Sequence, residues 1–427
     1  MINDENNTLL TRTGPGTPMG ELFRRYWIPA LMSSDLPEPD CPPVRAPLLS
    51  EKLVAFRDTE GRIGMIGEFC AHRGVSLWFG RNEECGLRCA YHGWKYDVNG
   101  QCVDLPSEAE ETGMRARIKL KSYPCVERGG VIWTYMGPPQ DRPPLPDFEW
   151  VHLPASHVVV TRRSQESNYL QAIEGGIDSS HVSFLHSGEL NTDPFHRNTQ
   201  GAKFARSTKT TFDIFNSPGG LIIGARRDAD PGYYYWRITQ WIMPWYTLIP
   251  PYGGGNALNG HAWVPIDDEN CMAWSMTFHP TDPIPEKHIE LIKDGNGVHA
   301  LLIPGTTRPV ANMSNDYLID RSLQKSRRHF NGIKGLAMQD ASVQESMGPI
   351  ADRTKENLVS TDNAIILARQ RLLKAAKAVQ EGGRAPGLNP EDQLVRSASF
   401  IIPVQANFKE HALDAVKYRK GVPHVAA

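Results

Sequence analysis

Apolar and polar residues alternate in short runs along the first third of the chain, and turn residues separate these runs. Three pairs of runs each flank a turn of two or three residues: 52–58 with 62–66, 94–98 with 101–105, and 123–127 with 131–136. The turn in the second pair is Asn99-Gly100, a dipeptide typical of two-residue β-hairpins. The pattern predicts an all-β unit whose core covers about residues 45–140.

A proline-rich segment, GPPQDRPPLP at 137–146, interrupts this pattern and is typical of a linker. Longer apolar runs follow it and predict strands at 219–227, 232–250, 261–267 and 271–278. We therefore expect two domains, residues 1–150 and residues 151–427.

Helical segments are fewer. Residues 168–176 have helical character, and the clearest helix lies within 361–387, with a Thr-Asp start and a Gly-Gly stop. Residues 284–350 are mixed and polar and predict no definite element. Strands and helices together indicate an α+β chain.

Composition narrows the classes of function. The 427 residues include 46 Lys+Arg and 48 Asp+Glu, so charge indicates neither nucleic acid nor an anionic membrane as a partner. No apolar run approaches the roughly 18 residues of a membrane span, and the polar, acidic N-terminus does not resemble a secretory signal. Seven cysteines fit reduced thiols and metal ligands better than disulfides. We expect a cytoplasmic protein.

Two Cys/His pairs stand in the first domain, Cys70 with His72 and Cys89 with His92. Structural zinc sites usually open with two Cys and end with two His, whereas a Rieske [2Fe–2S] centre takes two Cys on one iron and two His on the other. Unrelated core cysteines and surface histidines are a third interpretation. Because each loop offers one Cys and one His, the spacing favours the Rieske centre.

The segment EGGIDSSHVSFLH places Asp178, His181 and His186 at spacings of three and five. Two imidazoles and one carboxylate form the ligand set of non-haem Fe(II) enzymes, although two histidines five apart are, taken alone, better explained by surface or capping roles. Together with Cys-x-His and Cys-x-x-His, the segment resembles the Asp-x-x-His-x-x-x-x-His pattern of the Rieske non-haem iron oxygenases. The resemblance implies that His181 and His186 bind a mononuclear iron.

The resemblance also implies the role of two carboxylates. In this family the upstream Asp, here Asp178, links a Rieske histidine of the neighbouring subunit to an iron-ligating histidine. The iron-binding carboxylate comes from later in the chain, where the candidates are Asp340, Glu345, Asp352 and Asp362. We expect Asp362, with Asp352 next, because Asp362 opens the clearest helix and the family places its carboxylate there. Helix capping is the alternative role of such an Asp.

Further segments, among them GPGTPMGELFRRYWIPA, VAFRDTEGRIG and QESMGPIADRTKENL, resemble the phthalate dioxygenase branch of this family. The resemblance implies an N-terminal Rieske domain and a catalytic domain with an antiparallel sheet flanked by helices, of the helix-grip or START-like type. It also implies a homotrimer or a dimer of trimers. Electrons would come from NADH through a separate reductase that carries FMN and a plant-type [2Fe–2S] centre.

The implied reaction is the oxidation of an aromatic carboxylate by dioxygen at Fe(II), as in dihydroxylation of a phthalate-like ring. The alternative is O-demethylation of a methoxylated, lignin-derived aromatic acid. A Rieske protein for electron transfer alone is a third hypothesis, but it needs only about the first third of this chain.

Three arginines in predicted strands are candidates to bind the substrate carboxylate, because a guanidinium donates two parallel hydrogen bonds to it. They are Arg226, Arg227 and Arg237. Successive strand residues point to opposite faces, so at most one of Arg226 and Arg227 faces inward. Ser179, beside the iron ligands, is a further candidate.

Overall fold

The computed structural model describes residues 2–427, which form two compact units. One unit is Thr13–Pro143, and the other combines residues 2–12 with Pro144–Ala427. We expected a division at residue 150 with the whole N-terminus in the first domain. The N-terminal segment instead packs in the second unit, because the Tyr169 hydroxyl donates to the Leu10 carbonyl at 2.6 Å.

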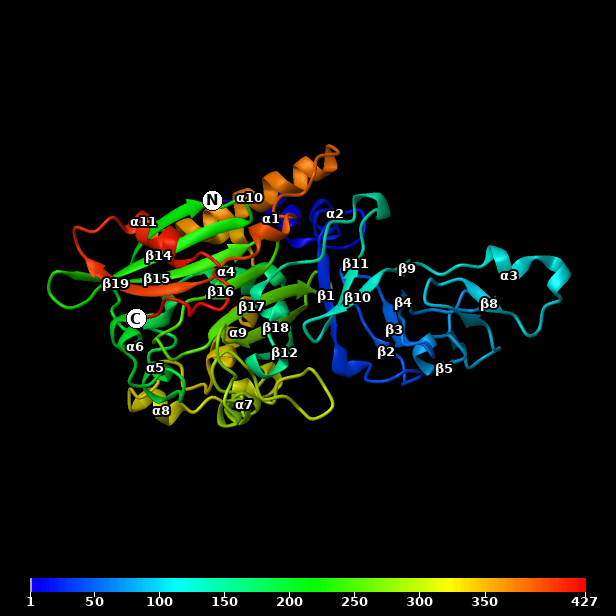
Figure 1. Ribbon diagram of the computed structural model, residues 1–427, viewed down its shortest axis with the longest axis horizontal. Helices are drawn as coiled ribbons and strands as arrows, with labels where there is room; N and C mark the ends of the chain where they lie inside the picture. Colours follow the sequence, from blue (N-terminus) through cyan, green and yellow to red (C-terminus); the bar gives the residue numbers. More distant parts are fainter. Residues whose placement is uncertain (1) are drawn as a thin grey trace. The chain divides into compact units, whose positions relative to one another are not determined.

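The first unit consists of three small antiparallel sheets, in the orders β1-β11-β10, β2-β3-β4-β9 and β5-β6-β7-β8 (Figure 1). Its strands are β1 (Trp27–Met32), β2 (Val44–Arg45), β3 (Leu53–Arg57), β4 (Ile63–Gly67), β5 (Arg81–Glu83), β6 (Gly86–Arg88), β7 (Lys95–Tyr96), β8 (Cys102–Asp104), β9 (Ser122–Tyr123), β10 (Cys125–Arg128) and β11 (Val131–Tyr135). Two short helices, α2 (Pro18–Phe23) and α3 (Met114–Arg117), accompany them.

The three hairpins predicted in this unit are confirmed. Strands β3 and β4 pair antiparallel, as do β7 with β8 and β10 with β11. One apolar core joins the first two of these hairpins, and it includes Phe56, Ile66 and Leu87 together with Cys70 and Cys89. The two cysteines are therefore anchored in the core of the unit.

The second unit is built on one eight-stranded antiparallel sheet in the order β12-β18-β17-β16-β15-β14-β13, with β19 also paired to β15. Its strands are β12 (Val158–Gln165), β13 (Thr211–Asn216), β14 (Gly220–Asp228), β15 (Tyr233–Ile242), β16 (Tyr246–Ile249), β17 (Leu258–Pro265), β18 (Cys271–Phe278) and β19 (Ala398–Pro403). The long run predicted at 232–250 is thus two strands, β15 and β16. They pair with each other, with Ile242 opposite Tyr246.

The helices of the second unit are α1 (Asp4–Thr11), α4 (Tyr169–Ile177), α5 (Glu189–Thr192), α6 (Gln200–Ala205), α7 (Glu286–Lys293), α8 (Arg321–Lys325), α9 (Leu336–Glu345), α10 (Asn363–Gln380) and α11 (Phe408–Ala415). Several of them pack against the sheet, among them α4, α6, α10 and α11 (Figure 1). Helix α4 packs on β16, β17 and α9, and α10 packs on β14. The predicted helices at 168–176 and within 361–387 are confirmed as α4 and α10. The α+β class is confirmed as well.

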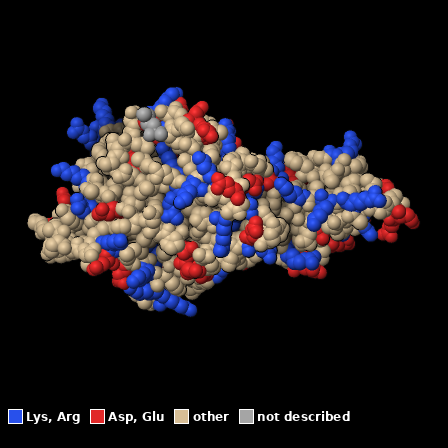
Figure 2. All heavy atoms as spheres, turned by 90° about the horizontal axis from the view of Figure 1, so that it is seen from above, with Lys and Arg blue, Asp and Glu red and all other residues tan. Residues whose placement is uncertain are grey.

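On the face drawn in Figure 2, acidic and basic side chains are interspersed rather than gathered by sign. Within residues 2–427, no helix combines the length and apolar character that crossing a bilayer requires.

Candidate functional site

Two loops of the first unit carry the Cys/His pairs and share one backbone geometry. The Cys70 N–H donates to the Val75 carbonyl and the Gly74 N–H to the Cys70 carbonyl, both at 2.9 Å. In the second loop the Cys89 and Gly93 N–H groups make the equivalent bonds, at 2.8 and 3.1 Å. Gly74 and Gly93 have φ of 71° and 74°, a region that a side chain disfavours. Each loop therefore presents its Cys and His from the same kind of tight turn.

The thiols and imidazoles of these loops face different environments. Cys70 and Cys89 are buried, whereas His72 is exposed and His92 half-buried, with their ring centroids 4.4 Å apart. The Tyr96 hydroxyl lies 3.2 Å from the Cys70 sulfur and accepts from the Ala71 N–H at 3.1 Å. Hydrogen bonds to a ligand sulfur hold it in place and tune a cluster's potential.

These four residues fit a [2Fe–2S] cluster better than a single zinc ion. Among residues 2–427, the one group of His, Cys, Asp or Glu side chains close enough to hold a single ion lies elsewhere. In a Rieske cluster two cysteines bind one iron and two histidines bind the other. The buried sulfurs of Cys70 and Cys89 and the more exposed imidazoles of His72 and His92 fit this division.

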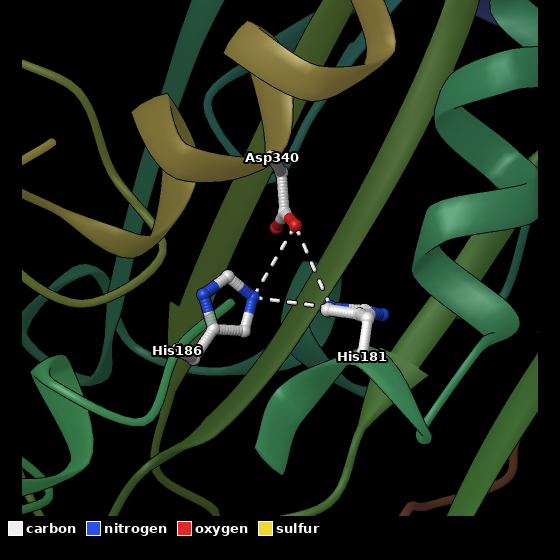
Figure 3. A group of neighbouring side chains, drawn as sticks. All are labelled: His181, His186 and Asp340. Carbon is white, nitrogen blue, oxygen red and sulfur yellow. Dashed lines mark hydrogen bonds and ion pairs between the residues drawn. The ribbon is translucent and has the colours of Figure 1, made fainter. Parts of the chain in front are cut away.

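That single-ion group consists of His181, His186 and Asp340 in the second unit (Figure 3). The Nε2 atoms of the two histidines are 3.1 Å apart, and Oδ1 of Asp340 lies 3.5 Å from His181 and 3.2 Å from His186. Ligand atoms in neighbouring positions on an ion at about 2.1 Å lie about 3 Å apart. The triangle therefore fits one divalent ion bound on a single face, the facial arrangement of non-haem iron sites.

Two glycines at the end of α4 bring the histidine segment into place. A Cβ on Gly176 would lie 2.2 Å from the Trp263 ring of β17, and one on Gly175 would lie 2.3 Å from the side chain of Gln344 on α9. A larger residue at 176 would force the Trp263 ring to move, and one at 175 would displace the end of the Gln344 side chain. Helix α4 consequently ends against β17 and α9, and the 3₁₀ turn that begins at His181 faces Asp340.

The second ring nitrogen of each histidine has its own partner. Nδ1 of His186 lies 2.7 Å from Oε1 of Gln339, whose amide nitrogen donates to the Ile333 carbonyl at 2.8 Å. This bond fixes the amide, so Nδ1 of His186 donates and Nε2 is left free for an ion. Nδ1 of His181 lies 3.3 Å from Oδ2 of Asp178. Such partners orient metal-binding imidazoles.

The electrostatics of the site formed by His181, His186 and Asp340 favour a cation. Burial acts to raise the pKa of Asp340, yet the nearby His186 and His181 hold it at about 2. Burial acts to lower the pKa of His181, but Asp178 and Asp340 outweigh it and raise the pKa above its usual value. Positive charge is thus stabilised between the three groups, and a divalent metal ion supplies that charge.

The prediction that Asp362 completes the iron site is corrected to Asp340. Oδ2 of Asp362 accepts from the Val359 N–H at 2.7 Å, so this carboxylate is engaged in the 3₁₀ turn Ser360–Asp362 that leads into α10. The other candidates are occupied as well: Asp352 accepts from the Thr354 N–H at 3.1 Å, and Glu345 pairs with the Tyr317 hydroxyl. Asp340, weighed but not preferred, is the carboxylate beside the histidines.

A cavity of about 80 Å³, here called the inner cavity, opens beside His181, His186 and Asp340. It is lined by Ser179, Arg237, Tyr252 and Trp263 together with His181, His186 and Asp340. Arg237 is buried with its guanidinium 3.8 Å above the Tyr252 ring, and its Nε has no hydrogen-bond partner among the described residues.

The other two candidate arginines lie on opposite faces of β14, as strand alternation predicts. Arg227 is buried and donates to the Ser179 carbonyl at 2.5 Å, and burial together with the charge of Arg237 lowers its pKa to about 10. Arg226 is half-buried and stacks over the Tyr234 ring at 4.4 Å. Of the three, Arg237 lines the inner cavity.

Sequence reasoning did not identify Gln339 or Tyr96 as partners of the metal ligands. Neither belongs to a motif that signals such a role. The position of Gln339 one residue before Asp340 gives a clue only once Asp340 is known as a ligand.

Models of two protein families match most of the chain. A Rieske [2Fe-2S] domain matches residues 26–124, and a LigXa C-terminal domain like family matches residues 134–422. The chain is 38% identical over 425 residues to the 3-chlorobenzoate-3,4-dioxygenase oxygenase subunit of Comamonas testosteroni, covering 96% of this chain and 97% of that protein.

A second relative and a solved structure are also similar to this chain. The phthalate 4,5-dioxygenase oxygenase subunit of Pseudomonas putida is 35% identical over 413 residues, covering 94% of this chain and 92% of that protein. The structure of dicamba monooxygenase bound to 3,6-dichlorosalicylic acid has a TM-score of 0.59 at 18% identity, covering 84% of this chain and 98% of that chain. The similarity to this structure supports the fold of the two units.

Proposed function

Since this chain belongs to the Rieske non-haem iron oxygenases as an oxygenase subunit, we propose that it oxidises an aromatic carboxylate, by dihydroxylation of a phthalate-like ring. The observation that carries the substrate class is Arg237. Its guanidinium is buried in the wall of the inner cavity, where it donates to the Pro250 carbonyl at 3.1 Å and lies over the Tyr252 ring, but no carboxylate of the described residues forms an ion pair with it. A buried charge without a counter-ion is costly, so a carboxylate of the substrate is its natural counter-ion.

The protein's own groups divide the remaining work. When bound, the cluster supplies electrons one at a time and the mononuclear iron supplies the site at which dioxygen is reduced. His181, His186 and Asp340 hold that iron, and Asp178 and Gln339 orient the two imidazoles. Arg227 fixes the Ser179 carbonyl beside the cavity. The aromatic walls formed by Tyr252 and Trp263 exclude water from the ring.

The electron donor and the oligomer complete the proposal. A separate cytoplasmic reductase, with FMN and a plant-type [2Fe–2S] centre, takes electrons from NADH and reduces the cluster. The subunits form a homotrimer or a dimer of trimers, in which Asp178 receives electrons from the cluster of a neighbouring subunit. Exposed aromatic side chains support contacts of this kind: Phe69, Phe79 and Tyr91 on the first unit, and Phe184 next to the iron site.

Product analysis tests the proposed reaction. The iron-loaded protein, NADH and a surrogate reductase are supplied with oxygen and a panel of benzoates, phthalates and methoxybenzoates. Diols are expected, with one equivalent of NADH consumed per product. Formaldehyde from the methoxybenzoates would identify O-demethylation instead. Reduction of the cluster without oxidation of any acid would contradict both reactions.

Replacement of Arg237 by Gln is expected to weaken binding of the aromatic acid by about ten- to a hundredfold, because a buried charge-assisted bond contributes roughly 1.5–3 kcal/mol. Calorimetric titration of the protein with the acid measures the change. Arg226→Gln is the matched control, because Arg226 lies on the opposite face of β14, and it should bind as the parent does. Equal affinity in the Arg237 variant would place the carboxylate elsewhere.

A further inference from the structure

A second and larger cavity adjoins the inner one. It has a volume of about 420 Å³ and is here called the outer cavity. Three side chains line both cavities and so mark their junction: His196, Asn259 and Val298. The outer cavity extends from this junction between the loop before β17, the start of α7 and the C-terminal segment near His424.

The inner cavity alone is small for an aromatic substrate. Its 80 Å³ compares with the roughly 150 Å³ of a cavity known to hold one benzene ring. A ring bound at Arg237 and the iron site must therefore extend toward the junction. The outer cavity then leaves space for a second ring beyond it, and ligand sites commonly span 300–1,000 Å³.

The outer cavity also contains buried polar atoms that lack side-chain partners. Within the described chain, the imidazoles of His196 and His424 have no side-chain hydrogen-bond partner and meet only the backbone of Phe195 and of Asn256, and Oδ1 of Asn256 accepts no hydrogen bond. The two histidines are 4% and 8% exposed. The carboxylate nearest to His196 is Asp193, 3.9 Å from Nε2, and its oxygens already accept the N–H groups of Phe195 and Gly297. Buried polar groups of this kind require a partner.

The charges around the outer cavity indicate which partner fits. Among the described lining residues there is no Lys or Arg, and Asp282 lies at the exposed rim. A second carboxylate would meet no cation there. Imidazole and amide groups suit instead a neutral group that both donates and accepts, such as a phenolic hydroxyl.

We propose that the substrate is an aromatic monocarboxylate of two rings, whose far ring carries a neutral hydrogen-bonding group held by His196 and His424 in the outer cavity. This proposal rests on the proposed function, which places the carboxylate at Arg237 and the near ring beside the iron. His196, at the junction, then selects for substrates that reach beyond one ring.

Binding to the iron-loaded protein under nitrogen tests this, with benzoate, 3-phenylbenzoate and 3-(4-hydroxyphenyl)benzoate as probes. We expect the hydroxylated two-ring acid to bind at least tenfold more tightly than benzoate. His196→Phe, similar in size but unable to hydrogen-bond, should weaken the hydroxylated acid by about three- to tenfold and leave 3-phenylbenzoate unchanged. His196→Asn, which can still hydrogen-bond, should weaken binding of the hydroxylated acid less than His196→Phe does. His411→Phe, at an exposed position of α11, should leave the binding of all three acids unchanged.

A second variant tests the volume independently of hydrogen bonding. Ala257 lines only the outer cavity, so Ala257→Phe should fill it, abolish the preference for two rings and leave benzoate binding intact. If benzoate binds as tightly as the two-ring acids, or if His196→Phe affects both two-ring acids alike, the proposal is overturned while the proposed function stands. If no acid binds at all, both the two-ring substrate and the proposed function are contradicted.

Discussion

Replacing Asp340 with Asn is expected to remove the mononuclear iron and all oxygenase turnover while the visible spectrum of the cluster remains. The amide keeps the size of the side chain but loses the negative charge between His181 and His186. Loss of a residue that only orients a ligand already costs about 10- to 100-fold in metal affinity, so loss of a ligand should cost more. Iron analysis should fall from about three per chain to about two.

The matched control is Asp362→Asn. Asp362 accepts from the Val359 N–H in the 3₁₀ turn that precedes α10, and the side-chain oxygen of Asn can accept the same bond. The variant should retain all its iron, its stability and its activity. The opposite result, iron lost from the Asp362 variant and kept in the Asp340 variant, would restore Asp362 as the ligand.

The fold of the first unit followed from the sequence because its signals are local. Asn99-Gly100 and the other short turns determine which runs pair, and each hairpin needs only its own residues. The limits of the units were less predictable. Residues 2–12 pack in the second unit through contacts such as that of Leu10 with Tyr169, and no local pattern reveals a partner so distant in the chain.

In the iron site, too, the ligands that are close in sequence were predicted and the distant one was not. His181 and His186 belong to one short segment, whereas Asp340 comes from α9, a helix that the sequence did not reveal. The apolar periodicity that identifies most surface helices is absent there, because Gln339 and Gln344 are buried among the apolar residues of α9. Asp362 was favoured because it opens α10, whose Thr-Asp start and Gly-Gly stop mark a helix in the sequence, and because the family places its carboxylate there.

The second large effect is expected from Asp178→Asn. Oδ2 of Asp178 faces Nδ1 of His181, and Oδ1 accepts from the backbone and hydroxyl of Ser180. The hydrogen bonds of Ser180 and His181 hold the pKa of this carboxyl below its usual value despite its burial. Asn preserves the shape but is a weaker acceptor and can present an N–H where an oxygen is needed. If Asp178 links a neighbouring cluster to the iron as proposed, electron transfer to the iron should therefore fail.

This variant should keep both metal centres and accept electrons from the reductase at the parent rate, yet lose most turnover. The diagnostic measurement is reoxidation of the reduced cluster after substrate and oxygen are added together. In the parent the cluster should reoxidise, and in the variant it should stay reduced. Ser180→Ala, which removes only the hydroxyl bond to Oδ1, is the milder control and should slow reoxidation little. Reoxidation of the Asp178 variant at the parent rate would mean that electrons reach the iron by a route that does not pass through Asp178. Full activity of a dilute monomer would mean that they do not come from a neighbouring subunit.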